Sequence, residues 1–76
     1  METLSRITQT PGVMEGKACI RGMRVTVGMI LSELGAGTSI EQLLADFPYL
    51  EREDVMQSIQ YAAYLVQERE IELAAP

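Results

Sequence analysis

The sequence predicts a mainly α-helical domain: a three-helix, helix-turn-helix-like (winged or homeodomain-like) module with a small β element at its N-terminus. From residue 27 onward, apolar residues recur every three or four positions, and Gly35-Ala36-Gly37 and Pro48 divide this stretch into three helical segments. Before residue 27, short apolar stretches alternate with Pro-Gly and glycine breaks, a pattern typical of strands and turns. We therefore expect a single domain over residues 1–76, with the β element at 1–26 and the three-helix module at 27–76.

The β element is expected to contain a short edge strand and a small hairpin. Residues 4–10 have strand character until Pro11-Gly12 ends it. Residues 18–20 and 24–26 then flank Gly22-Met23, and glycine at the first central position suits a type II′ turn, where φ is positive. This hairpin would place Arg21 and Arg24 side by side as a basic spot.

The first two helices carry recognisable start and stop signals. Thr26 can cap the first helix, which Gly35-Ala36-Gly37 ends. Ser39 can cap the second, with Gln42 reaching back to complete a capping box, and Pro48 prevents its continuation. The side chains expected to be buried are Val27, Ile30, Leu31 and Leu34 in the first helix, and Ile40, Leu43, Leu44 and Phe47 in the second.

The third helix is expected to run from near Glu51 to about Glu70 or Leu73. Roughly twenty residues at 1.5 Å each make a rod of about 30 Å, longer than the first two helices can cover. Its expected buried stripe is Val55, Ile59, Ala62 and Val66, and Tyr61, Tyr64 and Leu65 lie beyond that stripe. An apolar excess needs a second surface, so the sequence predicts a homodimer with Ile59, Ala62, Ala63 and Val66 at its interface.

Charge is distributed unevenly along this acidic chain of net charge −5. Residues 1–28 hold four basic and two acidic residues, a net +2, whereas residues 29–76 hold two basic and nine acidic residues, a net −7. The N-terminal quarter is therefore expected to meet an anionic partner, and the helical remainder a basic protein.

The residue inventory argues against catalysis and against a bound cofactor. The chain has no histidine, and its one cysteine, Cys19, lies in an apolar stretch that favours a core position. Glu51, Glu53 and Asp54 open the third helix, where acids complement the helix dipole, so we interpret them as structural rather than as catalytic or metal-binding. The sequence thus predicts a non-enzyme without metal, cofactor or small-molecule substrate. It also shows neither a membrane span nor a signal peptide, which predicts a cytoplasmic protein.

One string of residues resembles a known prokaryotic family. Residues 16–27 read Gly-Lys-Ala-Cys-Ile-Arg-Gly-Met-Arg-Val-Thr-Val, preceded by Pro11-Gly12 and followed by Gly-Thr-Ser-Ile-Glu-Gln-Leu at 37–43 and Phe-Pro-Tyr-Leu at 47–50. In these motifs the chain resembles the domain of unknown function 433 (DUF433) family over nearly its whole length. One departure is Glu51, where relatives tend to have a threonine before the last helix, and Glu51 is the weaker N-cap.

The resemblance implies a tri-helical or winged helix-turn-helix relative, often dimeric, that acts as the antitoxin of a type II toxin–antitoxin pair. Its toxin would be a PIN-like ribonuclease. Because the third helix opens with three acids and one base, it is poorly suited to the major groove of DNA.

Contacts with operator DNA are therefore expected at Lys17, Arg21 and Arg24 instead. Two alternatives stay open. These arginines can pair with internal acids such as Glu33, Asp46 or Glu53, and the protein can be a dimeric structural or protein-interaction module that binds no nucleic acid.

Overall fold

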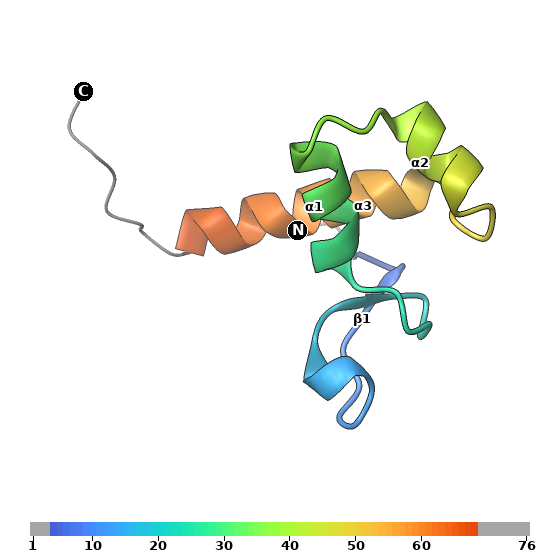
Figure 1. Cartoon of the computed structure of the whole chain (residues 1–76). Helices are drawn as coiled ribbons and strands as arrows, with labels where there is room; N and C mark the ends of the chain where they lie inside the picture. Colours follow the sequence, from blue (N-terminus) through green and yellow to red (C-terminus); the bar gives the residue numbers. More distant parts are fainter. Residues whose placement is uncertain (1–3, 69–76) are drawn as a thin grey trace.

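The structure is a computed structural model that describes residues 4–68 as three helices and a two-stranded antiparallel sheet (Figure 1). This is the mainly helical class, with a small N-terminal β element, that the sequence predicts. In chain order the elements are β1 (Ile7–Thr8), the short 3₁₀ helix η1 (Met14–Gly16), β2 (Cys19–Ile20), α1 (Val27–Gly35), α2 (Ile40–Asp46) and α3 (Arg52–Glu68).

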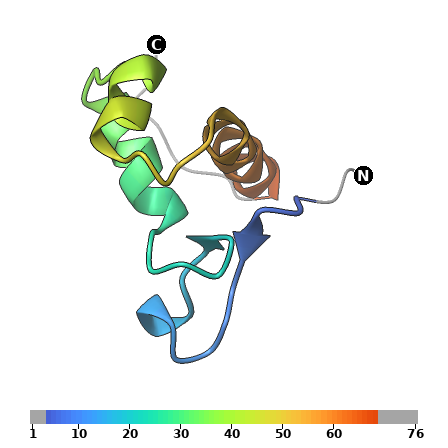
Figure 2. The ribbon, with the colours of Figure 1, turned by 90° about the vertical axis from the view of Figure 1, so that its right-hand side faces the viewer.

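The helices form one layer and the strands lie at its edge. Helix α3 is central to the fold, because it contacts α1, α2 and β1. Figure 1 shows its C-terminal half extending past α1, and Figure 2, which looks almost along α3, shows α1 and α2 on one side of it and the strands below. Among the described residues, no helix combines the length and apolarity needed to cross a membrane.

The β element is smaller than expected and its turn lies one residue earlier. β1 pairs with β2 in the register Ile7↔Ile20, and one further bridge joins Cys19 to Thr26. The predicted type II′ turn centred on Gly22-Met23 is wrong. Arg21 and Gly22 both have positive φ, at 47° and 73°, and the Met23 amide donates to the Ile20 carbonyl at 2.8 Å, which is the type I′ pattern. The shift brings Met23 into contact with the core.

The two predicted helix caps are confirmed. The Thr26 hydroxyl accepts from the Met29 amide and the Ser39 hydroxyl accepts from the Gln42 amide. The predicted capping box is wrong, because the Gln42 side chain donates forward to Asp46 at 2.8 Å instead of back toward Ser39.

The core lies where α1, α2 and α3 meet β2. Its fully buried apolar side chains include one from each of these four elements: Ile20, Ile30, Leu43 and Val55. Leu31 and Leu34 of α1, and Ile40, Leu44 and Phe47 at α2, are only partly buried and pack around this centre. Cys19 is 2% exposed, which confirms the expected core position.

The predicted inner face of α3 is correct only at Val55. Ile59 is 40% and Val66 68% exposed, whereas Asp54 and Ser58 are completely buried. This polar face can be buried because Arg6 and Arg21 pair with the Asp54 carboxylate, while the Ser58 hydroxyl donates to the backbone carbonyl of Asp54 in its own helix at 2.8 Å. α3 begins one residue after Glu51, and its predicted end at Glu70 or Leu73 lies outside the described residues.

Candidate functional site

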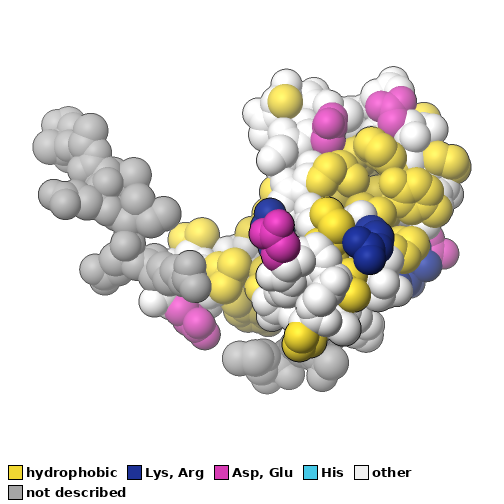
Figure 3. All heavy atoms as spheres, turned by 60° about the horizontal axis from the view of Figure 1, so that its bottom comes forward, with side chains coloured by type: hydrophobic (Ala, Val, Ile, Leu, Met, Phe, Trp, Pro, Cys, Tyr) yellow, Lys and Arg dark blue, Asp and Glu magenta, His cyan; other side chains and the backbone are white. Residues whose placement is uncertain are grey.

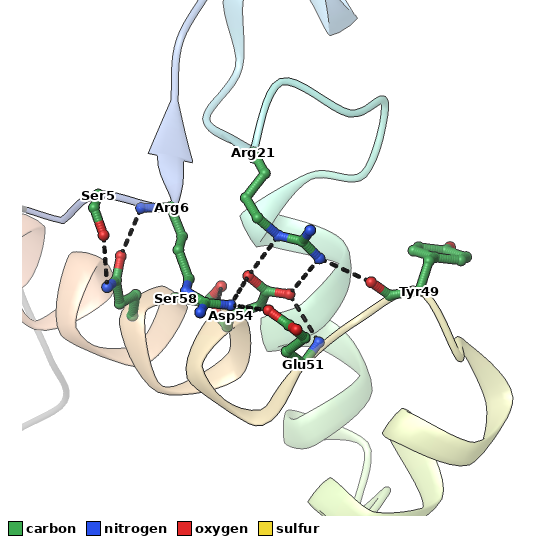
Figure 4. Close-up of polar contacts among 8 residues, drawn as sticks. Ser5, Arg6, Arg21, Tyr49, Glu51, Asp54 and Ser58 are labelled. Atoms are coloured by element: carbon green, nitrogen blue, oxygen red, sulfur yellow. Dashed lines mark hydrogen bonds and ion pairs between the residues drawn. The ribbon is translucent and has the colours of Figure 1, made fainter.

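Arg21 and Arg24 do not form the predicted basic spot together. The Arg21 guanidinium turns toward α3, where Nε and Nη2 donate to the two oxygens of Asp54 at 3.1 and 2.9 Å, and Nη2 also donates to the Tyr49 carbonyl at 2.8 Å (Figure 4). Arg21 therefore pairs internally, as one of the sequence alternatives foresaw, but with Asp54 rather than with the acids named there.

Arg6 is the second arginine that binds Asp54, and nothing in the sequence around Arg6 indicated this role. Its Nη1 donates to Asp54 at 3.1 Å and to Glu51, and its backbone amide donates to the Gln57 side chain at 2.8 Å. The arrangement ties β1 and the Arg21 turn to the first two turns of α3 (Figure 4). The hydrogen bonds to these carboxylates raise the pKa of both Arg6 and Arg21 above the usual arginine value, so both stay charged.

Asp54 is the centre of the cluster, and both of its carboxylate oxygens are doubly occupied. Besides the two arginines, it accepts the Glu51 amide at 2.8 Å, the bond by which the third residue of a helix caps its start. Burial raises the pKa of Asp54, but the hydrogen bonds from Arg21, the Glu51 amide and Arg6 outweigh it and leave that pKa below its ordinary value of 3.8. With its lone-pair positions filled, this carboxylate is ionised and structural rather than a base awaiting a substrate.

Lys17 and Arg24 differ from Arg21 in their surroundings. Both are exposed, and neither side chain forms a hydrogen bond or ion pair with any of the residues 4–68. Of the three residues predicted to contact nucleic acid, these two keep their cationic groups available for an anionic partner.

The four residues predicted at the dimer interface lie along one side of α3. Ile59, Ala63 and Val66 are exposed, and Ala62 is half-buried. Ala62 and Val66 also line an open groove of about 650 Å³ between α1 and the second half of α3, with Val27, Leu31 and Leu65 as further apolar walls and Lys17 as its charged lining residue. Figure 3 shows hydrophobic side chains in view along this projecting half of α3.

Acidic side chains cover the other exposed parts of α2 and α3. Over residues 29–68, seven acids stand against one base, Arg52. Five of the seven are exposed, and they are Glu41, Asp46, Glu51, Glu53 and Glu68. Glu51 is paired with Arg6, and Glu41 lies 3.5 Å from Arg52, so Asp46, Glu53 and Glu68 contribute the charge that no arginine or lysine of the described chain offsets.

Cysteine thiols and clustered acids are two kinds of side chain that often form reactive or metal-binding sites, and residues 4–68 include one cysteine and several acids. The Cys19 thiol is buried and lies 3.3 Å from the Lys17 carbonyl, to which it donates. Within residues 4–68, no group of three or more His, Cys, Asp or Glu side chains is placed to hold a metal ion.

The comparison with known proteins agrees with the motifs of the sequence. The family model described as "Protein of unknown function (DUF433)" matches residues 7–62, most of the chain. The chain belongs to the DUF433 family. The match includes the whole Arg21 turn and Asp54, but it begins one residue after Arg6 and ends before Ala63 and Val66.

A solved DUF433 structure has the same fold. The crystal structure of a DUF433 member protein from Anabaena variabilis, at 2.00 Å resolution, is 32% identical to this chain and superposes with a TM-score of 0.76 over 83% of it. The chain spans 62% of that protein's length. No curated protein matches the chain.

Proposed function

We propose that this DUF433 chain is the antitoxin of a type II toxin–antitoxin pair and that it binds a basic, PIN-like ribonuclease toxin through the exposed acids of α2 and α3. The observation that carries the proposal is the charge of this surface, where Asp46, Glu53 and Glu68 form no ion pair with any described residue. Complementary charge steers association and orients the partners. The internal use of Asp54 and the burial of Cys19 support a binding role rather than a catalytic one.

Operator binding is the second part of this proposal, and it involves fewer basic residues than the sequence predicts. Because Arg21 is held by Asp54, Lys17 and Arg24 are the two of the three predicted contact residues that remain for phosphates. A dimer would then make about four phosphate contacts, and log affinity should fall with log salt with a slope of roughly −3.6, whereas about six contacts with Arg21 included would give roughly −5. A dimeric interaction module without nucleic-acid binding is the alternative.

Charge reversal on the helices tests toxin binding. The chain is co-expressed with a PIN-like protein encoded beside it, and the affinity of the complex is measured by calorimetry at two salt concentrations. Asp46→Lys with Glu53→Lys should weaken the complex at least about tenfold, because two favourable charges become repulsive. Glu15→Lys is the control, because it reverses an exposed acid of η1 rather than of α2 or α3, and it should change little.

Two results would count against the antitoxin proposal. One is the absence of a complex with the neighbouring protein, and the other is a complex whose affinity ignores the helical charges. For the DNA part, Lys17→Glu with Arg24→Glu should abolish binding to promoter DNA. A preparation that binds no DNA at low salt, with or without the toxin, would refute the operator part, and the absence of toxin binding as well would leave the interaction module.

A further inference from the structure

Helices α1 and α3 flank a groove whose walls are apolar but only partly buried. Its volume is about 650 Å³, within the range of roughly 300–1,000 Å³ that concave binding sites occupy. Leu31 lines it from α1, Ala62 and Leu65 line it from the second half of α3, and all three are half-buried. We call this surface the α1–α3 groove. Folding of the described chain leaves these apolar walls accessible to a partner.

Gly28, the second residue of α1, lines the same groove at a position that does not require glycine. Its φ is not positive, and a Cβ placed there would meet only Thr26 Oγ1 at 3.9 Å, an ordinary contact. Glycine within a helix is less favourable than alanine, because it loses more conformational freedom on folding. The missing side chain therefore lowers stability without relieving any close contact among residues 4–68. What it provides is room for another backbone to approach α1 inside the groove.

Lys17 is the one charged residue, among those described, that lines the groove. It is exposed, and its ammonium group forms no ion pair or hydrogen bond within residues 4–68. A carboxylate on a bound partner would find an available cation here, whereas a basic group would meet a like charge. The groove is therefore complementary to an apolar surface that carries an acidic residue.

Backbone hydrogen bonding decides which kind of segment suits the groove. Its two long walls are helices, whose amides and carbonyls bond mainly within α1 and within α3 and are not offered to a partner. An extended segment against these walls would leave its own amides and carbonyls without partners, at a cost in free energy. A helix satisfies these groups internally and presents apolar side chains at every third or fourth position to such a groove.

We infer that the α1–α3 groove binds an amphipathic helix of the basic toxin, with apolar side chains between Leu31 and Leu65 and a carboxylate on Lys17. The backbone of that helix would lie against Gly28. The inference rests on the proposed function and names the contact that anchors the complex. The exposed acids of α2 and α3 would steer and orient the toxin, whereas well-packed apolar contacts carry most of the free energy of an interface. Lys17 would then bind either the toxin or operator DNA, and not both at once.

Filling the groove tests the site. Gly28→Leu places a large side chain where the toxin helix would approach α1, and it should weaken the complex with the neighbouring PIN-like protein at least about 30-fold in calorimetry. The free chain should unfold at the same temperature or higher, because leucine is the better helix former and a Cβ at Gly28 has no close contact. Gly35→Leu is the matched control. Gly35 is the other exposed glycine of α1 without positive φ and lies outside the groove, so this variant should keep the affinity of the wild type.

The results separate the groove from the proposed function. A Gly28→Leu chain with wild-type affinity, while Asp46→Lys with Glu53→Lys still weakens the complex, would overturn the groove contact and leave the toxin role standing. A wild-type chain that forms no complex would overturn both. If sedimentation equilibrium shows that Gly28→Leu removes self-association of the free chain and calorimetry shows an unchanged complex, the occupant is a second copy and the inference is wrong.

A charge substitution tests the carboxylate contact. Lys17→Met removes the charge but keeps the apolar stem, and it should weaken the complex about fivefold or more at low salt. Arg24→Met is the matched control, since Arg24 is likewise an exposed cation without a partner in the described chain but lies outside the groove. Because the toxin is basic, loss of this cation should leave the affinity unchanged or raise it slightly. Equal effects of the two substitutions would refute the contact with Lys17.

Discussion

Asp54 joins the β element to the helices through bonds that use both oxygens of its carboxylate. The donors to Asp54 are Arg6, which directly precedes β1, Arg21 in the hairpin turn, and the Glu51 amide just before α3. Replacing an ionised, completely buried carboxylate leaves these three donors without their shared acceptor. Since Arg6 and Arg21 are 28% and 37% exposed, water can solvate them in part and limit the loss.

We expect Asp54→Asn to lower the free energy of unfolding by about 2 kcal/mol at pH 7, in the range of charged hydrogen bonds. The pKa of Asp54 is below its ordinary value in the folded chain, so its contribution is present above pH about 4 and is lost as pH falls through the lowered folded value. Urea denaturation should therefore show a difference between wild type and variant that shrinks toward pH 2.

The exposed Asp46 gives the control for this prediction. Among the described residues its carboxylate accepts only from Gln42, on its own helix, so Asp46→Asn should change stability by less than about 0.5 kcal/mol at either pH. A pH-independent cost of Asp54→Asn would show that the residue acts through its shape and not through its charge.

Among the elements, the type I′ turn at Arg21-Gly22 needs an uncommon backbone conformation. It requires positive φ at both central residues, and Arg21 adopts φ 47° although it has a side chain. The internal ion pair with Asp54 offsets this strain by holding the guanidinium in place. Backbone geometry and electrostatics thus specify the same turn.

Gly22→Ala should destabilise the chain by about 1 kcal/mol, because alanine at φ 73° is strained even though open space surrounds the new methyl group. Thermal unfolding measures this effect. Gly35→Ala is the control: Gly35 ends α1 without positive φ and also faces open space, so alanine there should be neutral or stabilising by about 0.5 kcal/mol. Equal effects at the two positions would contradict the role given to backbone conformation.

At the scale of the whole molecule, the two parts distinguished in the sequence, residues 1–26 and 27–76, are joined by polar as well as apolar contacts. Ile7 and Ile20 pack with the helical core, and the Arg6–Asp54–Arg21 cluster closes the junction. No buried side-chain nitrogen or oxygen among the described residues lacks a hydrogen-bond partner. Such a junction couples the unfolding of one part to that of the other.

Hydrogen exchange should show this coupling. The Arg21 amide donates to the Arg6 carbonyl at 2.7 Å between the strands, and we expect it to exchange with the same free energy as the amides at the centre of α3, because both open only on global unfolding. In Asp54→Asn the strand amide should exchange through a local opening, with less protection than α3. A strand amide far less protected than α3 in the wild type would show that the junction is not cooperative.

The sequence by itself determined the class of the fold, the division into three helices, the caps at Thr26 and Ser39, and the core position of Cys19, because each depends on residues close together along the chain. Helical spacing, capping hydroxyls and the breaks at Gly35–Gly37 and Pro48 act locally. The DUF433 motifs could be read from the sequence for the same reason, since each is a short continuous string of residues.

Only the tertiary structure decided which side of α3 is buried and what Arg21 does. Both depend on the pairing of Asp54 with Arg6 across 48 residues of sequence and with Arg21 across 33, which no local spacing encodes. Apolar periodicity alone favoured Ile59 and Val66 for the inner face, since it gives no weight to an aspartate whose charge is neutralised by two arginines. The same pairing turned Arg21 away from the basic spot and left the apolar residues of α3 on the surface.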